Sequence, residues 1–317
     1  MYQTATLPLF PMLPAAGRPA PDAEALRRRA GVDYFDLLVR EILNKSEASR
    51  LPFDWTINPY RGCEFGCVYC YARATHGFFE STQPEDFESK IFVKRGAAEK
   101  LAQRLRKSDL RGQTIAIGTA TDPYQPAERH FGVTRSLLEV FTGVEGLHLS
   151  LTTKSPLVLK DLDILAELDR KHSIEIHMSI TTLDRDLARK LEPAAPDPQA
   201  RLRAVERLAE AGIAVIVNCM PVMPGINDSE AELAPLFAAA LAAGAVDVHH
   251  QALFLRPATR DKFFPWLKEE FPHLVGMYQR LYARSDYIDG SAKDQLLTTF
   301  RRLRLQHGLP RAQAARA

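Results

Sequence analysis

The sequence has few cysteines, no long hydrophobic run and almost no net charge. Its 317 residues include 4 cysteines, too few for a disulfide framework in a chain of this length. The longest apolar run, at 233–246, is rich in alanine and too short to cross a bilayer. The first 21 residues carry no basic stretch ahead of their apolar residues, and prolines interrupt them, so they do not read as a signal peptide. These absences predict a cytoplasmic protein that does not act at a membrane.

The balance of charge excludes a generally basic nucleic-acid-binding surface. Lys and Arg number 41 and Asp and Glu number 39, so the formal net charge is +2. Such a value gives no general attraction to nucleic acid or to an anionic membrane, although a local basic groove is compatible with it. With 46% hydrophobic and 25% charged residues, the chain is globular rather than disordered.

Short β-branched runs alternate with longer helical stretches from residue 55 onward. The runs predict strands at 55–60, 114–118, 147–152, 174–180, 214–220 and 246–255. The stretches between them predict helices at 96–107, 134–142, 156–169, 199–211 and 229–243. Such alternation builds right-handed βαβ units around a parallel sheet. Because six units do not complete an eight-stranded barrel, the sequence predicts an α/β fold, a partial (β/α)6 TIM-like barrel.

The predicted barrel occupies residues 51–260 and is flanked by two extensions. Residues 1–50 are predicted to form a Pro-rich N-terminal extension that contains a helix over 22–43. Residues 261–317 are predicted to form a C-terminal helical extension that closes one side of the barrel. The segments that follow the predicted strands are richest in Gly, Pro, Asp, Thr and Arg, and active sites of parallel α/β folds lie at these strand ends.

Three of the four cysteines lie within eight residues, directly after the first predicted strand. Cys63, Cys67 and Cys70 have the spacing C-x3-C-x2-C. Three thiolates can bind three irons of a [4Fe–4S] cluster and leave one iron open for a substrate or cofactor. A structural zinc site with His76 or Cys219 as fourth ligand is an alternative, although such sites more often use two separate C-x2-C pairs. An Fe–S redox sensor or electron carrier is another.

The segment NPYRGCEFGCVYCYAR, at 58–73, resembles the signature of the radical S-adenosylmethionine (SAM) superfamily. More narrowly, the chain resembles the spore photoproduct lyase-like group, often labelled DNA repair photolyases. The segments that carry this narrower resemblance are FESKIFVK at 87–94, TATDPYQPAER at 119–129, TTKS at 152–155 and LEPAAPDPQARL at 191–202. The resemblance extends from about residue 51 to residue 257.

The resemblance implies a cluster bound by Cys63, Cys67 and Cys70 and a SAM molecule beside it. Tyr69 would pack against SAM or the cluster. Further residues implied in SAM binding are Thr121, Asp122, Lys154 and Ser179, with Glu128 and Arg201 as weaker candidates. Each has a simpler interpretation: Asp122-Pro123 is also a turn signal, Lys154 also precedes a helix start, and Arg201 also fits a solvated helix face.

The group's hydrogen-donor cysteine near the second barrel strand is missing from this chain. Spore photoproduct lyase uses such a cysteine together with two tyrosines that flank the last cluster cysteine. The tyrosines are present as Tyr69 and Tyr71, but Thr119 stands where the thiol is expected. Threonine donates hydrogen atoms far less readily than a thiol, which argues against the photoproduct lyase reaction itself. Cys219, at the end of the fifth predicted strand, is the alternative donor, or else a buried small side chain.

These observations predict a radical SAM enzyme of the lyase or transferase type. Reductive cleavage of SAM would give a 5′-deoxyadenosyl radical that abstracts hydrogen from an unidentified substrate. The implied partner is an external electron donor such as a flavodoxin- or ferredoxin-like protein. Nucleic acid stays open as a substrate, and Arg256, Arg260 and Lys262 near the barrel mouth are candidate phosphate contacts. The sequence leaves the oligomeric state undetermined.

Overall fold

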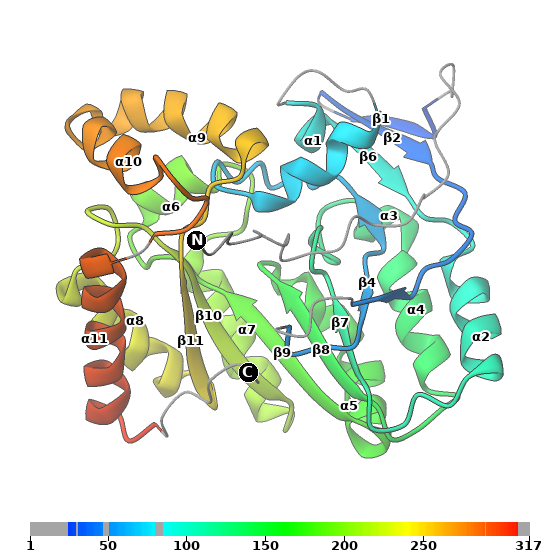
Figure 1. Cartoon of the computed structure of the whole chain (residues 1–317). Helices are drawn as coiled ribbons and strands as arrows, with labels where there is room; N and C mark the ends of the chain where they lie inside the picture. The colour runs from blue at the N-terminus through cyan, green and yellow to red at the C-terminus, as the bar shows by residue number, and fades with distance from the viewer. Residues whose placement is uncertain (1–24, 30, 47–50, 80–84, 289, 310–317) are drawn as a thin grey trace, which may run out of the picture.

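A computed structural model describes residues 25–29, 31–46, 51–79, 85–288 and 290–309, and its centre is a seven-stranded sheet (Figure 1). Six strands are parallel, and each pairs with the next in the chain, as the predicted partial barrel requires. They are β4 (Trp55–Ile57), β7 (Thr114–Ile117), β8 (His148–Thr153), β9 (Ser173–Ser179), β10 (Ala214–Val222) and β11 (Asp247–Ala252). A short strand, β3 (Asn44–Lys45), extends the sheet as an antiparallel edge beside β4. The predicted α/β fold and its strand order are confirmed.

Helices connect the strands and cover one face of the sheet. They are α2 (Ala97–Lys107), α3 (Glu128–Phe131), α4 (Val133–Phe141), α5 (Leu162–Lys171), α6 (Arg185–Leu191), α7 (Pro198–Glu210) and α8 (Glu230–Ala242). A 3-10 helix (Pro156–Asp161) precedes α5, and the Ser155 side chain caps it by accepting the Leu157 N–H. At the start of α8, the Ser229 hydroxyl donates to the Glu232 side chain and accepts no backbone N–H, so no capping box forms there.

Alternation along the strands separates an apolar face from a polar face. Val215, Val217 and Cys219 of β10 belong to the main core, which the surrounding helices complete. On the opposite face, the Asn218 side-chain oxygen accepts a hydrogen bond from the ring of His177 on β9. The centroid of the His177 ring lies 5.8 Å from that of His249 on β11. The inner face of the partial barrel is therefore polar, which suits a cavity better than a packed interior.

A second, four-stranded sheet replaces the helix predicted over 22–43. Its order is β1 (Arg27–Arg29), β2 (Val32–Asp36), β6 (Lys90–Val93) and β5 (Tyr60–Arg61), and α1 (Asp86–Ser89) precedes β6. The helix prediction is wrong for the described residues 25–29 and 31–43, and residues 22–24 and 30 lie outside them. β2 pairs with β6, which is some sixty residues away, and Gly31 adopts φ +82° between β1 and β2. This long-range pairing overrides the helical propensity of the Arg-rich segment.

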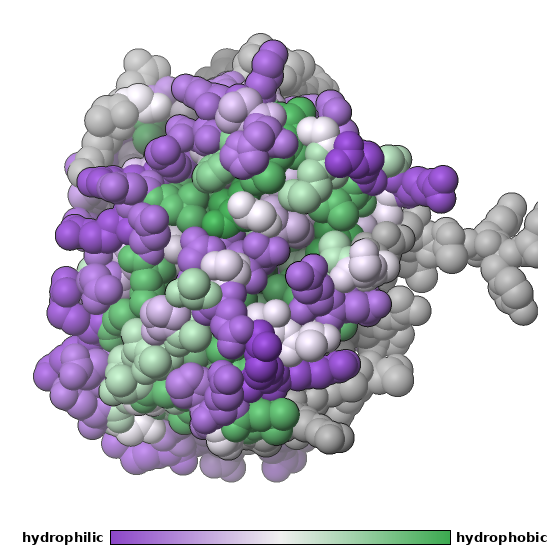
Figure 2. All heavy atoms as spheres, turned by 90° about the vertical axis from the view of Figure 1, so that its left-hand side faces the viewer, coloured by the Kyte–Doolittle hydropathy of each residue, from purple (hydrophilic) through white to green (hydrophobic). Residues whose placement is uncertain are grey.

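The C-terminal helices pack beside the open edge of the barrel. They are α9 (Pro257–Glu270), α10 (Val275–Leu281) and α11 (Gly290–Gln306), with a 3-10 turn (Pro272–Leu274) between the first two. α9 and α10 share a second apolar cluster with the cysteine loop, whereas α11 packs on the main core. Figure 2 shows hydrophilic and hydrophobic residues interspersed over this side of the molecule. Within the described residues, no helix is both long and apolar enough to span a membrane.

Candidate active site

The three clustered cysteines lie in one loop between β5 and a 3-10 helix (Tyr71–Phe79). Cys63 and Cys67 are buried and Cys70 is partly exposed, and all are free thiols. Burial raises the pKa of all three thiols, and repulsion between thiolates contributes to the increase for Cys63 and Cys67; the pKa of Cys67 is raised to about 12. Only a positively charged centre among them makes three buried thiolates favourable. The donor set therefore fits a metal centre.

Hydrogen bonds hold the backbone of this loop from several sides. Thr121 donates its hydroxyl to the Gly62 carbonyl at 2.7 Å, and Gln125 donates to the same oxygen at 3.1 Å. Arg73 donates to the Cys67 carbonyl at 3.1 Å and forms an ion pair with Glu88. The Thr259 hydroxyl of α9 donates to the Cys70 carbonyl at 3.2 Å. These bonds fix the backbone of the loop, as a site with defined geometry requires.

Replacing Gly62 with alanine is expected to disorganise this loop. Gly62 has φ +80°, and a Cβ there would lie 2.7 Å from the Lys90 carbonyl oxygen and 2.8 Å from that of Phe87. Gly112→Ala is the matched control, because Gly112 has φ +76° but nothing within 4 Å of a Cβ. Both variants carry the backbone penalty of about 1–2 kcal/mol, but Gly62→Ala also carries the clash. Urea unfolding should show a larger decrease in the free energy of unfolding for Gly62→Ala than for Gly112→Ala, and the iron content of Gly62→Ala should fall. An equal decrease in the two variants would contradict this role of Gly62.

Tyr69 takes part in a buried hydrogen-bond network that links the cysteine loop to the segment after β9 and to the end of α6. Its hydroxyl lies 3.0 Å from the Thr181 hydroxyl and donates to Glu192. Glu192 also accepts from Thr181 at 2.8 Å and forms an ion pair with Arg201. Burial alone would raise the pKa of Glu192, but the positive charges of Arg201 and Lys154 lower it to about 2. Glu192 is therefore a buried carboxylate anion that orients Tyr69.

Lys154 ends β8 above the ring of Tyr69, with Nζ 5.7 Å from the ring centroid. Burial would lower its pKa, but the negative charges of Cys67 and Glu192 raise it, so the ammonium group stays charged. Its backbone N–H donates to Asp122 at 2.7 Å, and the Thr153 hydroxyl donates to the same carboxylate at 2.7 Å. Thr121, Asp122 and Lys154 thus meet beside the cysteine loop, as the sequence predicts for chemistry at strand ends.

Two of the proposed SAM-binding residues have other partners. Glu128 accepts the N–H groups of Thr134 and Arg135 and an ion pair from Lys160 at 3.0 Å, so it holds the start of α4. Arg201 is fully buried rather than on a solvated helix face. Its guanidinium donates to the carbonyl oxygens of Pro196 and Ser179 and to Glu192. The contacts of Glu128 give its predicted SAM-binding role no support, and those of Arg201 make it a partner of Glu192.

Cys219 has a packing role. It is fully buried in the main core, on the face of β10 that carries Val215 and Val217. Asn218, which contacts His177, points to the other face. Burial raises the pKa of the Cys219 thiol to about 12. Of the two interpretations of Cys219, these contacts favour the buried small side chain and give the hydrogen-donor role no support, because strand alternation turns the thiol toward the core.

Tyr71 lies at the start of the 3-10 helix in contact with the end of the barrel. Its hydroxyl donates to the Thr119 carbonyl. Its ring lies 5.1 Å from that of Phe254, which in turn stacks on Tyr287 at 5.4 Å. Arg256, the residue before α9, is close enough to both tyrosines for its positive charge to lower their pKa. An aromatic row with a nearby cation therefore borders the cysteine loop.

The described residues do not provide the ligands that the alternative of a structural zinc site requires. Among the described residues, no three His, Cys, Asp or Glu side chains meet as ligands of a single metal ion would. The side chain of His76 lies outside the description, and Cys219 faces the core. Thiolates that bind separate irons of one cluster need no common ion, so the same spacing is compatible with a cluster.

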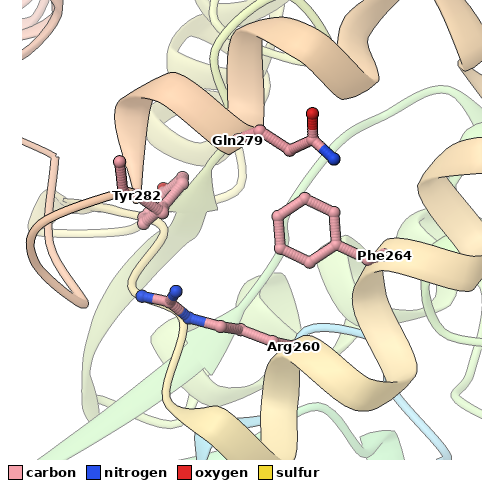
Figure 3. Close-up of a pocket in the computed structure, with 5 residues that line it drawn as sticks. Arg260, Phe264, Gln279 and Tyr282 are labelled. Atoms are coloured by element: carbon pink, nitrogen blue, oxygen red, sulfur yellow. The ribbon is translucent and has the colours of Figure 1, made fainter.

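A small pocket between α9 and α10 does not belong to this site. It measures about 260 Å³ and is lined by Arg260, Phe264, Gln279, Tyr282 and Ala283. Figure 3 shows Phe264 of α9 and Gln279 of α10 facing each other. Arg260 donates to the carbonyl oxygens of Leu255 and Ser285 and pairs with Asp286 at 3.1 Å. This predicted phosphate contact is a structural link between α9 and the segment before α11.

Sequence reasoning did not identify Glu192, Thr181 and Glu64, which hold the cysteine loop and Tyr69 in position. Glu192 lies in the LEPAAPDPQARL segment that carried the resemblance, so a signal was present without an assigned role. Thr181 and Glu64 carried none. Glu64 accepts hydrogen bonds from the Tyr34 hydroxyl at 2.9 Å and from the Ala127 N–H at 2.7 Å, and so connects the cysteine loop to β2 and to the start of α3.

Comparisons with known proteins agree with this arrangement. The family model of the radical SAM superfamily matches residues 57–236. An uncharacterised protein of Mycobacterium tuberculosis, Rv2578c, is 36% identical over 267 residues, which are 84% of this chain and 78% of that protein. An uncharacterised protein of Methanocaldococcus jannaschii, MJ0683, is 31% identical over 56% of this chain and 63% of its own length. A mutant of spore photoproduct lyase has a similar fold, with a TM-score of 0.65 at 19% identity over 86% of this chain and 79% of that one.

Proposed function

This chain belongs to the radical SAM superfamily, and we propose that Cys63, Cys67 and Cys70 hold its [4Fe–4S] cluster. Enzymes of the superfamily use such a cluster and SAM, and they need an external electron donor. The observation that supports the assignment is the loop of three free thiols, two of them buried, at the carboxyl ends of the parallel strands. With SAM, such a cluster supplies an electron whose transfer cleaves SAM and yields a 5′-deoxyadenosyl radical that removes hydrogen from a substrate.

The protein's part is to bind SAM, orient it and exclude water. We assign the carboxylate of SAM to the ammonium group of Lys154, which the buried network keeps charged. Asp122, Thr121 and Ser179 lie at neighbouring strand ends, where the amino and ribose groups of SAM need polar partners. The Tyr69 ring lies against the Lys154 ammonium group and positions it. The ion pair of Glu192 and Arg201 in turn positions Tyr69, because Glu192 accepts the Tyr69 hydroxyl.

Tyr71 takes the place of Cys219 as the candidate for hydrogen transfer. The Tyr69 hydroxyl is engaged by Thr181 and Glu192, whereas that of Tyr71 meets a backbone carbonyl at the end of the second barrel strand. The Tyr71 ring contacts Phe254, and Phe254 stacks on Tyr287 near Arg256. A planar substrate such as a nucleobase fits an aromatic border of this kind. A nucleic-acid substrate would bind in a salt-sensitive way and lose affinity in Arg256→Ala; binding insensitive to both would favour a peptide or a small molecule.

The function is tested by anaerobic reconstitution. The protein should hold about four irons per chain, the content of one [4Fe–4S] cluster. Reduction with dithionite in the presence of SAM should release 5′-deoxyadenosine, and a flavodoxin- or ferredoxin-like donor should replace dithionite. A reduced, fully loaded sample that releases none would refute the proposal; a reversible cluster signal unaffected by SAM would favour a redox carrier. Deuterium in the released 5′-deoxyadenosine identifies the substrate among labelled candidates.

Replacing Lys154 with methionine is expected to weaken SAM binding without loss of iron. A hydrogen bond to a charged group contributes about 1.5–3 kcal/mol, so affinity should fall roughly ten- to hundredfold. Lys171→Met is the control, because Lys171 is an exposed lysine paired with Glu167. Titration of SAM against the electron paramagnetic resonance signal of the reduced protein measures the change. Equal SAM affinity in both variants would remove Lys154 from the site.

A further inference from the structure

The inner face of the partial barrel carries a row of polar side chains that starts at the proposed SAM site. Ser179 of β9, Asn218 of β10 and His249 of β11 are register partners on three adjacent parallel strands. Partners on parallel strands point to the same face of the sheet, and neighbouring strands lie about 4.8 Å apart. Because Ser179 is one of the residues assigned to SAM, Asn218 and His249 lie beside the place where a substrate would meet SAM.

A hydrogen bond from His177 fixes the orientation of the Asn218 amide group. Nδ1 of His177 lies 3.3 Å from the Asn218 oxygen, which can only accept, so Nδ1 carries the proton. The other ring nitrogen makes only a longer contact, 3.7 Å to the Glu175 carboxylate. The Asn218 amide nitrogen has no acceptor among the described residues and is not enclosed by protein, so its N–H groups are available to a ligand.

Asp247 fixes the proton of His249 in a similar way. Nε2 of His249 lies 3.3 Å from a carboxylate oxygen of Asp247, which can only accept. Burial lowers the pKa of His249, so its ring is neutral at pH 7 and the single proton is on Nε2. Nδ1 is therefore an acceptor. It has no donor among the described residues, and 40% of the His249 side chain is exposed, so a ligand can reach it.

We propose that Asn218 and His249 bind a lactam edge of the substrate, a planar group whose C=O and N–H lie side by side. The Asn218 N–H donates to the carbonyl oxygen, and Nδ1 of His249 accepts the N–H. A linear peptide bond is trans, so its C=O and N–H point in opposite directions and cannot both meet this pair. A phosphate or carboxylate group offers no N–H, and β9, β10 and β11 contain no Lys or Arg. Nucleobases and cyclic dipeptides both carry the edge that fits.

This inference rests on the proposed function, because it places the substrate beside SAM. Its test measures binding alone, which needs neither reduction of the cluster nor cleavage of SAM. A protein that binds a lactam through Asn218 but releases no 5′-deoxyadenosine would keep the subsite and lose the function. A protein that releases 5′-deoxyadenosine but does not recognise the lactam would keep the function and lose the subsite.

Calorimetry on the reconstituted protein with SAM tests the subsite with two lactams, uridine and glycine anhydride. Each is compared with its N-methylated counterpart, 3-methyluridine or sarcosine anhydride, which lacks the N–H. At least one lactam should bind, and N-methylation should weaken its binding at least about tenfold, because Nδ1 of His249 loses its donor. Binding of uridine indicates a nucleobase as the source of the lactam, and binding of glycine anhydride indicates a cyclic peptide. No binding of either lactam, or equal affinity for a lactam and its methylated counterpart, would overturn the proposal.

Variants of the two side chains make the outcome specific. Asn218→Asp keeps the shape of the side chain but replaces its donor with an acceptor, and lactam affinity should fall at least about tenfold. His249→Phe should cause a similar decrease, and it replaces a partly exposed side chain that the fold does not need. His250→Phe is the matched control, because His250 points to the opposite face of the same strand and stacks on Phe300 with ring centroids 3.8 Å apart. Equal lactam affinity in His249→Phe and His250→Phe would remove His249 from the subsite and refute the inference.

Discussion

Replacing Cys67 with alanine is expected to remove the cluster and abolish 5′-deoxyadenosine formation. Cys67 is buried, and its position among two other thiols leaves no protein group to substitute as ligand at that corner of the loop in the described structure. Loss of an outer partner of a metal ligand already costs about 10–100-fold in metal affinity, so loss of a ligand itself should cost more. Iron per chain, the visible absorption of the cluster and released 5′-deoxyadenosine measure the effect.

Cys219→Ala is the matched control for this prediction. Cys219 is a buried free cysteine of the same chain, but its side chain belongs to the main core. The variant should keep its iron and release 5′-deoxyadenosine, with a modest loss of stability from the removed sulfur. Loss of iron in Cys219→Ala equal to that in Cys67→Ala would show that the fourth cysteine is also a ligand and would contradict the assignment.

The barrel could be predicted from sequence because its signals are local. Six β-branched runs of the right length alternate with five helical stretches, and each βαβ unit follows one handedness. The cysteine spacing is equally local. Its place after the first strand then fixed the edge of the sheet at which Thr121, Asp122 and Lys154 meet.

The parts that could not be predicted depend on contacts between distant segments. β2 pairs with β6, and no local pattern in 22–43 reveals that partner. Glu192 and Arg201 are nine residues apart in the sequence. Their role in the site nevertheless depends on the hydrogen bonds of Glu192 with Tyr69 and Thr181, which come from other parts of the chain. The packing role of Cys219 depends on which face of β10 is covered by helices, and a run of buried residues on a central strand does not reveal this.

The largest expected effect on stability is that of Glu192→Ala. The variant leaves the Arg201 guanidinium buried, with an exposed fraction of 1%, and without its carboxylate. Breaking a buried ion pair from one side typically costs about 3–5 kcal/mol, because the remaining charge is uncompensated. The hydroxyls of Tyr69 and Thr181 lose their acceptor in the same step. Urea unfolding of the reconstituted protein should therefore show a large decrease in the free energy of unfolding.

Two further variants separate the ion pair from the network that it supports. Glu230→Ala breaks the exposed pair with Arg302 and should cost no more than about 1 kcal/mol. Glu192→Leu combined with Arg201→Met removes both charges, and should recover part of the stability lost in Glu192→Ala. The double variant should nevertheless bind SAM weakly, because Tyr69 and Lys154 have lost the carboxylate that holds one in place and keeps the other charged. Full recovery of SAM affinity together with stability would mean that Glu192 and Arg201 serve the fold alone.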